Sequence, residues 1–248
     1  MRARREKRAN VAKVFYLCNY MSFKEILGRY STATVGLAFI ALGIAFSVKS
    51  NLGVSALNSV QYALAVKFPR FSFGDYNFGI FSLFIFVQLA LLRRNFKLID
   101  LLQLVANFIL SYMVDTFNWT LSHLGLVPET MAMRFVFIAL CCIFTAFGIS
   151  IEVAAGAWML PAEMTVSAFT RTLGGKFSTN KVIMDTTLVI IAIVLCIVWF
   201  GSWLGPAVQP ILGWGTLISA VAIGLIMKLT DPLVGKIVFA SKKRRGLL

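Results

Sequence analysis

The chain has few charged residues, and very few of these are acidic. Only 14% of its 248 residues are charged, with ten acidic against 24 basic side chains. A water-soluble domain carries about 25% charged residues, so this sequence lacks the polar surface needed to cover a globule in water. The hydrophobic fraction of 59% and the mean hydropathy of +0.83 predict an all-α polytopic membrane protein instead.

Residues that usually carry catalysis or bind metals are also scarce. The single histidine, His123, stands alone in an expected loop, and the four cysteines show no metal-ligand spacing. The sequence has no histidine cluster, no carboxylate pair of the glycosidase kind and no serine–histidine–aspartate arrangement. We therefore expect a protein that is not an enzyme and that holds neither a metal nor a cofactor.

The net charge of +14 is concentrated at the two ends of the chain. Basic residues precede the first apolar segment and fill the tail after residue 235. Such flanking charges are typical of cytoplasmic ends that face anionic lipid headgroups. We therefore expect both termini to be cytoplasmic, with anionic lipid as a partner and no nucleic acid. No cleavable signal peptide is expected before the first span.

Six segments are long and apolar enough to cross a bilayer, which takes about 20 residues. Two shorter stretches, 51–66 and 157–172, contain serines, a carboxamide or a carboxylate, and a Gly or Pro near the start. These two are predicted to be re-entrant or half-membrane helices, with full spans as the alternative. The six predicted spans are 31–48, 75–92, 99–121, 131–153, 182–203 and 213–234.

Basic residues test this topology. With both short stretches re-entrant, Arg93 lies inside, and the loop 122–130, which has no Lys or Arg, lies outside. Lys49, Lys67 and Arg70 are exceptions, because they fall on the outer side. Four tryptophans are expected at the outer interface, where indoles favour the headgroup level: Trp119, Trp199, Trp203 and Trp214.

A weak self-similarity with a period of about 105 residues divides the membrane part in two. Gly43 aligns with Gly148, and Asn58 falls opposite Glu163. Three spans per half is an odd number, which predicts an inverted 3+3 internal repeat, with chance similarity as the alternative. The predicted parts are 1–30 (basic N-terminus with an interfacial amphipathic helix), 31–121 (first membrane repeat), 122–130 (outer loop), 131–235 (second repeat) and 236–248 (basic tail).

Ionisable side chains at membrane depth are few, and each is a functional hypothesis by default because a charge there is costly. Glu163 lies in the second short stretch, and Lys181 and Asp185 share one face of the next helix at i,i+4 spacing. They are interpreted either as a polar cluster on a substrate path or, for the last two, as a structural ion pair. Glu152 is expected to be solvated near the inner interface. Asp115 is the fifth such residue.

The first half offers uncharged polar groups in the equivalent region. Asn51, Ser55, Asn58 and Gln61 are predicted to contribute, with the second-half cluster, to substrate binding near the midplane. The alternative is that they serve as interhelical hydrogen-bonding groups.

Several short motifs stand out in the chain: Gly43-Ile44, Asn51-Leu52-Gly53-Val54-Ser55, the run 177–185 and Gly213-Trp214-Gly215-Thr216-Leu217-Ile218. They resemble those of the YitT/YczE group of bacterial membrane proteins. The resemblance covers about residues 31–234. The chain departs from the pattern at Ala56 and Asn58, where a proline and an acidic residue are expected, and Pro161 and Glu163 are closer to it. The resemblance implies a bacterial inner-membrane protein, a transporter of undefined substrate.

The leading functional hypothesis is a carrier for a small polar or charged solute that works by alternating access. One alternative is a substrate-binding membrane subunit of an ATPase-driven importer, since the chain has no phosphate-binding loop of its own. Another is a regulatory membrane protein that transports nothing. A homo-oligomer or an ATPase module would be the protein partner.

Overall fold

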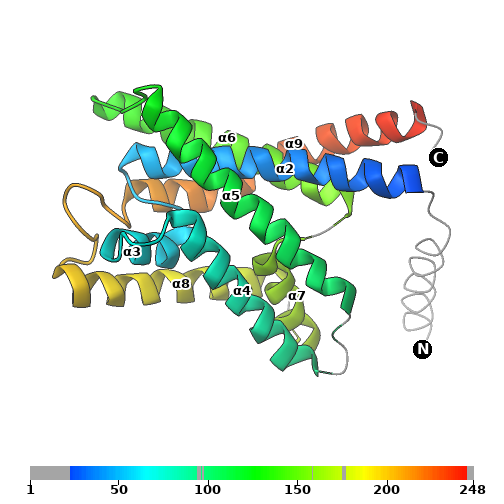
Figure 1. Ribbon diagram of the computed structural model, residues 1–248, viewed down its shortest axis with the longest axis horizontal. Coiled ribbons are helices and arrows are strands. Elements are labelled where there is room, and N and C mark those ends of the chain that lie inside the picture. Colours follow the sequence, from blue (N-terminus) through cyan, green and yellow to red (C-terminus); the bar gives the residue numbers. More distant parts are fainter. Residues whose placement is uncertain (1–22, 94–95, 97, 158, 175–176, 245–248) are drawn as a thin grey trace.

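The computed structural model is helical throughout the part of the chain that it describes (Figure 1). It describes the backbone of residues 23–93, 96, 98–157, 159–174 and 177–244, and the side chains of 27–93, 96, 100–157, 159–174 and 179–235. Within these residues there are eight α-helices and no strand, which confirms the all-α class. They are α2 (Phe23–Ser50), α3 (Ser59–Lys67), α4 (Phe73–Leu92), α5 (Leu102–His123), α6 (Met131–Ala155), α7 (Pro161–Thr172), α8 (Phe177–Phe200) and α9 (Trp214–Arg244), with 3-10 turns η1 (Ala56–Asn58) and η3 (Leu98–Leu101).

Five of these helices, α2, α4, α6, α8 and α9, are long and apolar enough to cross a membrane. Helix α5, with 22 residues, is about 33 Å long but carries more polar side chains, among them Gln103, Asn107 and Asp115. The chain is thus a membrane protein with several spans, and the count of six stays a prediction. The predicted amphipathic helix at 10–28 falls mostly outside the described residues, as does the basic tail from 245 onwards.

The two predicted short helices are present as separate elements. Helix α7 has 12 residues, and η1 with α3 covers the 12 residues 56–67. Twelve residues of helix rise about 18 Å, whereas the hydrocarbon core is about 30 Å thick. Neither segment is long enough to cross it.

The long helices α2 and α6 pack closely on each other and run antiparallel (Figure 1). Helix α5 packs on α2, and α9 packs on α6. The short helices pack across the two halves, α3 against α8 and α7 against α4. The apolar core lies between these packed helices. It includes Leu37, Phe81 and Leu110, which are almost fully buried.

Glycines allow α2 and α6 to approach backbone to backbone. A Cβ on Gly148 would lie 2.7 Å from both Gly36 O and Ile40 N, and a Cβ on Gly43 would lie 3.0 Å from Cys141 O and 2.9 Å from Thr145 N. Adding 105 to the residue numbers on α2, which are 36, 40 and 43, gives those on α6, which are 141, 145 and 148. The two helices therefore meet in a reciprocal manner, with the same contacts seen from each side.

Helix boundaries follow the same offset. Helix α2 ends at Ser50 and α6 at Ala155, and each is followed by a residue in the left-handed region, Asn51 (φ 52°) and Gly156 (φ 61°). The segments 56–67 and 161–172 then begin and end 105 residues apart. Asn and Gly are the residues that adopt this conformation most readily, which explains how both helices stop at corresponding points.

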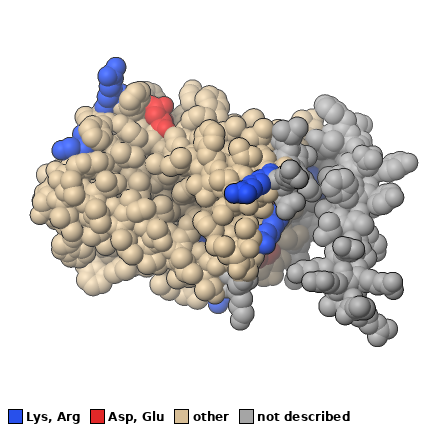
Figure 2. All heavy atoms as spheres, turned by 90° about the horizontal axis from the view of Figure 1, so that it is seen from below, with Lys and Arg blue, Asp and Glu red and all other residues tan. Residues whose placement is uncertain are grey.

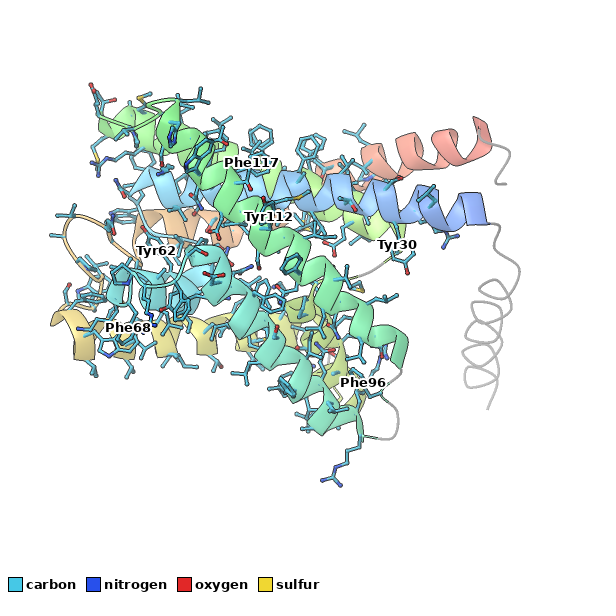
Figure 3. All side chains as sticks on the ribbon, in the orientation of Figure 1. Tyr30, Tyr62, Phe68, Phe96, Tyr112 and Phe117 are labelled. Carbon is cyan, nitrogen blue, oxygen red and sulfur yellow. The ribbon has the colours of Figure 1, made fainter. Side chains whose placement is uncertain are left out.

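Aromatic residues gather where α5 and α8 end and α9 begins, at the left of Figure 1. The rings of Trp203 and Trp214 are mostly exposed there, as is that of Trp119 near the end of α5. Phe68, just after α3 (Figure 3), meets the Trp199 ring edge to face with the centroids 5.4 Å apart. This clustering at one end is what a membrane interface selects.

Charged side chains are unevenly spread over the molecular surface. On the face in Figure 2, Lys and Arg gather toward its left end and beside the undescribed residues on the right, with a broad uncharged surface between. The start of α2 and the end of α9 lie at the same end of the molecule (Figure 1).

Candidate functional site

A cavity of about 280 Å³ lies between the two halves of the chain. Side chains of α2, η1, α4 and α5 line it from the first half, and those of α6, α7, α8 and α9 from the second. Most of its wall is apolar. Five of the seven residues predicted to bind substrate line it: Ser55, Asn58, Glu163, Lys181 and Asp185.

The other two predicted residues do not line the cavity. Asn51 forms the left-handed turn that ends α2. Gln61 is fully buried on α3, and neither its Oε1 nor its Nε2 has a hydrogen-bond partner among the described residues. Asn51 and Gln61 are therefore not part of the cavity wall.

Both short helical segments begin at the cavity. Ser55 precedes η1 with φ −61° and ψ 152°, and Leu160 precedes α7 with φ −61° and ψ 149°. Both residues line the cavity. Because the first N–H groups of a helix have no intrahelical partner, these ends present donors and a partial positive charge. The cavity therefore receives two such ends, one from each half.

The loop before η1 is held by α9 rather than by its own helix. Val54 N donates to Ile211 O at 3.0 Å, and Thr216 Oγ1 donates to Val54 O at 2.6 Å. A Cβ on Gly53 (φ 96°) would meet Gly213 N at 2.6 Å. Tight packing of this loop on the start of α9 positions Ser55 at the cavity.

Lys181 and Asp185 form an ion pair on the cavity wall. Lys181 Nζ lies 3.4 Å from Asp185 Oδ1, and the two side chains are 31% and 30% exposed. Glu163 on α7 lies close enough to interact electrostatically with both. The sequence leaves the ion pair and the polar cluster as alternatives. The structure contains the Lys181–Asp185 ion pair, and Glu163 interacts with it electrostatically.

Several buried polar atoms at the cavity have no hydrogen-bond partner among the described residues. Asn58 Nδ2 donates to Ser55 Oγ at 3.1 Å, which leaves Asn58 Oδ1 unpartnered. Ser47 Oγ and Glu163 Oε2 also have no hydrogen-bond partner among the described residues. A buried polar group without a partner costs about 1–3 kcal/mol. Their concentration around one cavity marks it as a place that accepts a polar ligand or water.

The expectation that Glu152 is solvated near the inner interface is wrong. This side chain, near the end of α6, is only 5% exposed, and it interacts electrostatically with Glu163. Its Oε1 has no partner among the described residues. Sequence reasoning missed it, although Glu152 follows Gly148 by one helical turn and therefore shares the face that packs on α2.

Asp115 has a structural role. Its Oδ1 accepts a hydrogen bond from Gly74 N at 2.8 Å, and its Oδ2 accepts one from Ser72 Oγ at 2.5 Å. Both donors belong to the first turn and N-cap of α4. A carboxylate in this position satisfies free N–H groups and favours the helix dipole. Asp115 thus fixes α4 to α5, away from the cavity.

Comparison with known proteins agrees with the family resemblance. The model of a family described as "Family of unknown function (DUF6198)" matches residues 27–232. The chain is also 23% identical over 212 residues to "Uncharacterized membrane protein YczE" of Bacillus subtilis (strain 168), a match that covers 84% of this chain and 88% of that protein. No solved structure matches the chain. The predicted likeness to YczE-type membrane proteins is confirmed.

Proposed function

The chain belongs to the family of unknown function DUF6198, and on that premise we propose that it is a transporter in the bacterial cytoplasmic membrane. It carries a small polar or charged solute by alternating access. The observation that carries this proposal is the cavity between the two halves, in which an ion pair, a further carboxyl and unpartnered polar atoms face one space. Ionisable residues within membrane segments are rare and often mark substrate or ion pathways.

Alternating access requires two halves that can exchange roles, and an inverted 3+3 repeat supplies them. The reciprocal contacts of Gly43 and Gly148 support such a repeat. So do the matched ends of α2 and α6 and of the two short segments. In this proposal α5 is the sixth span, its polar face turned inward against α2 and α4.

Both termini are proposed to be cytoplasmic. The start of α2 and the end of α9 lie at one end of the molecule, next to the strongly basic terminal segments. Single cysteines at Ser122 and Gly174, in a background with the four native cysteines replaced, test this topology with a membrane-impermeant maleimide. Labelling of both positions from the same side would contradict the inverted arrangement.

Ligand binding is tested first by thermal shift. The purified protein is screened in detergent against fractionated metabolite pools, and each stabilising compound is tested again with Glu163→Gln and Lys181→Ala. We expect both variants to lose the shift. Glu129→Gln and Lys228→Ala, at exposed positions, are the matched controls and should keep it. Hits that stabilise the two cavity variants as well as the wild type would place binding elsewhere.

Transport is tested next by uptake of the labelled hit into proteoliposomes. Uptake by the purified chain supports a carrier, and loss of uptake in Glu163→Gln ties it to the cavity. Binding without uptake, together with co-purification of an ATPase, would instead identify a substrate-binding subunit of an importer. The absence of both binding and uptake would favour a regulatory membrane protein.

A further inference from the structure

Two carboxyl groups with a buried oxygen atom that has no partner among the described residues come from consecutive helices, and one of them, Glu163, lines the cavity. Glu152 near the end of α6 and Glu163 in the first turn of α7 interact electrostatically. We propose that the Glu152–Glu163 pair is a proton-binding site that couples solute movement to a proton gradient, an inference that rests on the proposed transport function.

The position of the pair is the first argument. Glu152 is 5% exposed, and its Oε1 has no hydrogen-bond partner among the described residues, as is also true of Glu163 Oε2. Two ionised carboxylates that interact in apolar surroundings repel each other and lose their hydration. Binding one proton removes one charge and supplies a donor for an unpartnered oxygen. The pair therefore favours a singly protonated state.

Among the side chains that the structure describes, the charges around the pair do not provide a separate counterion for each carboxylate. On α8, Lys181 is already paired with Asp185, so these two groups together carry no net charge. On α2, Gly36 lies against the backbone of Glu152, and Arg29 stands about two turns nearer the start of that helix. The side chains of α4 and α5 that line the cavity, Phe81 and Leu110, are uncharged.

Helix α9 contributes two charged residues near this region, Lys228 and Asp231. Asp231 Oδ1 accepts a hydrogen bond from Ser150 Oγ at 2.6 Å, on the helix that carries Glu152. Both α9 residues are exposed. They therefore contact the lipid headgroups or water more than the buried pair.

The first half carries neutral groups in the corresponding places. An offset of 105 residues takes Ser47 to Glu152 and Asn58 to Glu163. Ser47 and Asn58 are both more than nine-tenths buried, and both have an unpartnered oxygen at the same cavity. The two half-sites thus share a geometry, but only the second can take up and release a proton.

Glu163 also connects the proposed proton site to the place where a solute would bind. It lines the cavity together with the Lys181–Asp185 ion pair. A proton that arrives from one side changes the charge that a solute meets in the cavity, and its release to the other side restores that charge. No covalent bond is made or broken.

The test uses dicyclohexylcarbodiimide, which reacts with protonated carboxyl groups in apolar surroundings and adds to them as an acylurea. The purified protein is labelled over pH 5–9, and modified peptides are quantified by mass spectrometry. We expect label on Glu163 or Glu152 that falls at least threefold as the pH rises. In Glu152→Gln, which removes the like charge, the midpoint for Glu163 should fall by about one pH unit or more. Glu129→Gln should leave it unchanged.

Each other result speaks against the proposal. Absence of label on both residues in the folded wild type, or label that does not vary with pH, overturns it without any variant. An unchanged midpoint in a folded Glu152→Gln would mean that the carboxyls titrate independently. Protection by sodium at constant pH would assign the site to that cation instead. Because labelling needs no substrate, a protein that labels as expected but moves no solute would refute the transport function and leave the proton site standing.

Discussion

Gly36 and Gly148 face each other across the α2–α6 crossing, where a Cβ on either would lie within 2.9 Å of the carbonyl oxygen of the other. The contact is between backbones, so no side chain can move aside to make room. In a membrane, close backbone approach at small residues is a main source of helix association.

Gly148→Ala is therefore expected to lower the free energy of unfolding by about 1–3 kcal/mol, as overpacking does in other proteins. The measurement is the midpoint of thermal unfolding in detergent. Gly79→Ala is the matched control, because a Cβ at Gly79 on α4 meets nothing within 4 Å and alanine favours a helix. Equal midpoints for the two variants would show that the crossing tolerates a methyl group.

Asp115→Ala is expected to destabilise the protein by about 1–3 kcal/mol, because Gly74 N and Ser72 Oγ lose their acceptor. Asp115→Asn should be milder, since the amide oxygen can still accept one bond. Thr116→Ala, at an exposed position on the next residue of α5, is the control. A ligand-binding role for Asp115 would instead appear as lost binding at normal stability.

Gln88 and Gln103 exchange two hydrogen bonds, at 3.1 and 3.0 Å, and Gln88 Nε2 also donates to Pro161 O at 2.9 Å. Gln88→Leu should release the first turn of α7 and raise hydrogen exchange in residues 161–172, because Gln103 and Pro161 lose a buried partner. The double change Gln88→Leu and Gln103→Leu should recover part of the lost stability, since it removes both amides. If the stability lost in the double variant equals the sum of the losses in the two single variants, the two glutamines do not act as a unit.

Asn58→Asp would place a carboxyl in the first half at the position that corresponds to Glu163. A buried carboxylate without its own cation is costly when charged, so this variant should resemble the wild type near pH 5 and lose stability as the pH rises. Thermal unfolding as a function of pH measures this, with Asn58→Ser as an uncharged control. Equal pH profiles for both variants would mean that this position is well hydrated.

Helix lengths and ends followed closely from the sequence where glycine or proline interrupts an apolar run. The predicted 157–172 and 75–92 compare with Pro161–Thr172 and Phe73–Leu92. Pro161 and the left-handed Gly156 are strong local signals. The ends of helices were thus readable because they depend on single residues and their immediate neighbours.

Which side of a helix faces the protein was less readable. Helix α6 is apolar on nearly all sides, so the sequence does not separate a lipid face from a packed face. Glu152 was therefore expected in water, although it is buried on α6, which packs closely on α2. Asn51 was expected at the binding site because it is polar. Its role is instead in the backbone, because position 51 has a positive φ that asparagine adopts readily. Burial depends on partners far away in the chain.

The constant offset between the helix ends of the two halves has a consequence for the history of the chain. Between Gly43 and Lys67, the helix ends and the close glycine contact recur 105 residues later, between Gly148 and Thr172, with no change of spacing, although few residues are identical. A single added residue in either stretch would turn every later side chain by about 100° around its helix axis. Two copies of a duplicated gene would diverge in this way, free to change residues but not to change length.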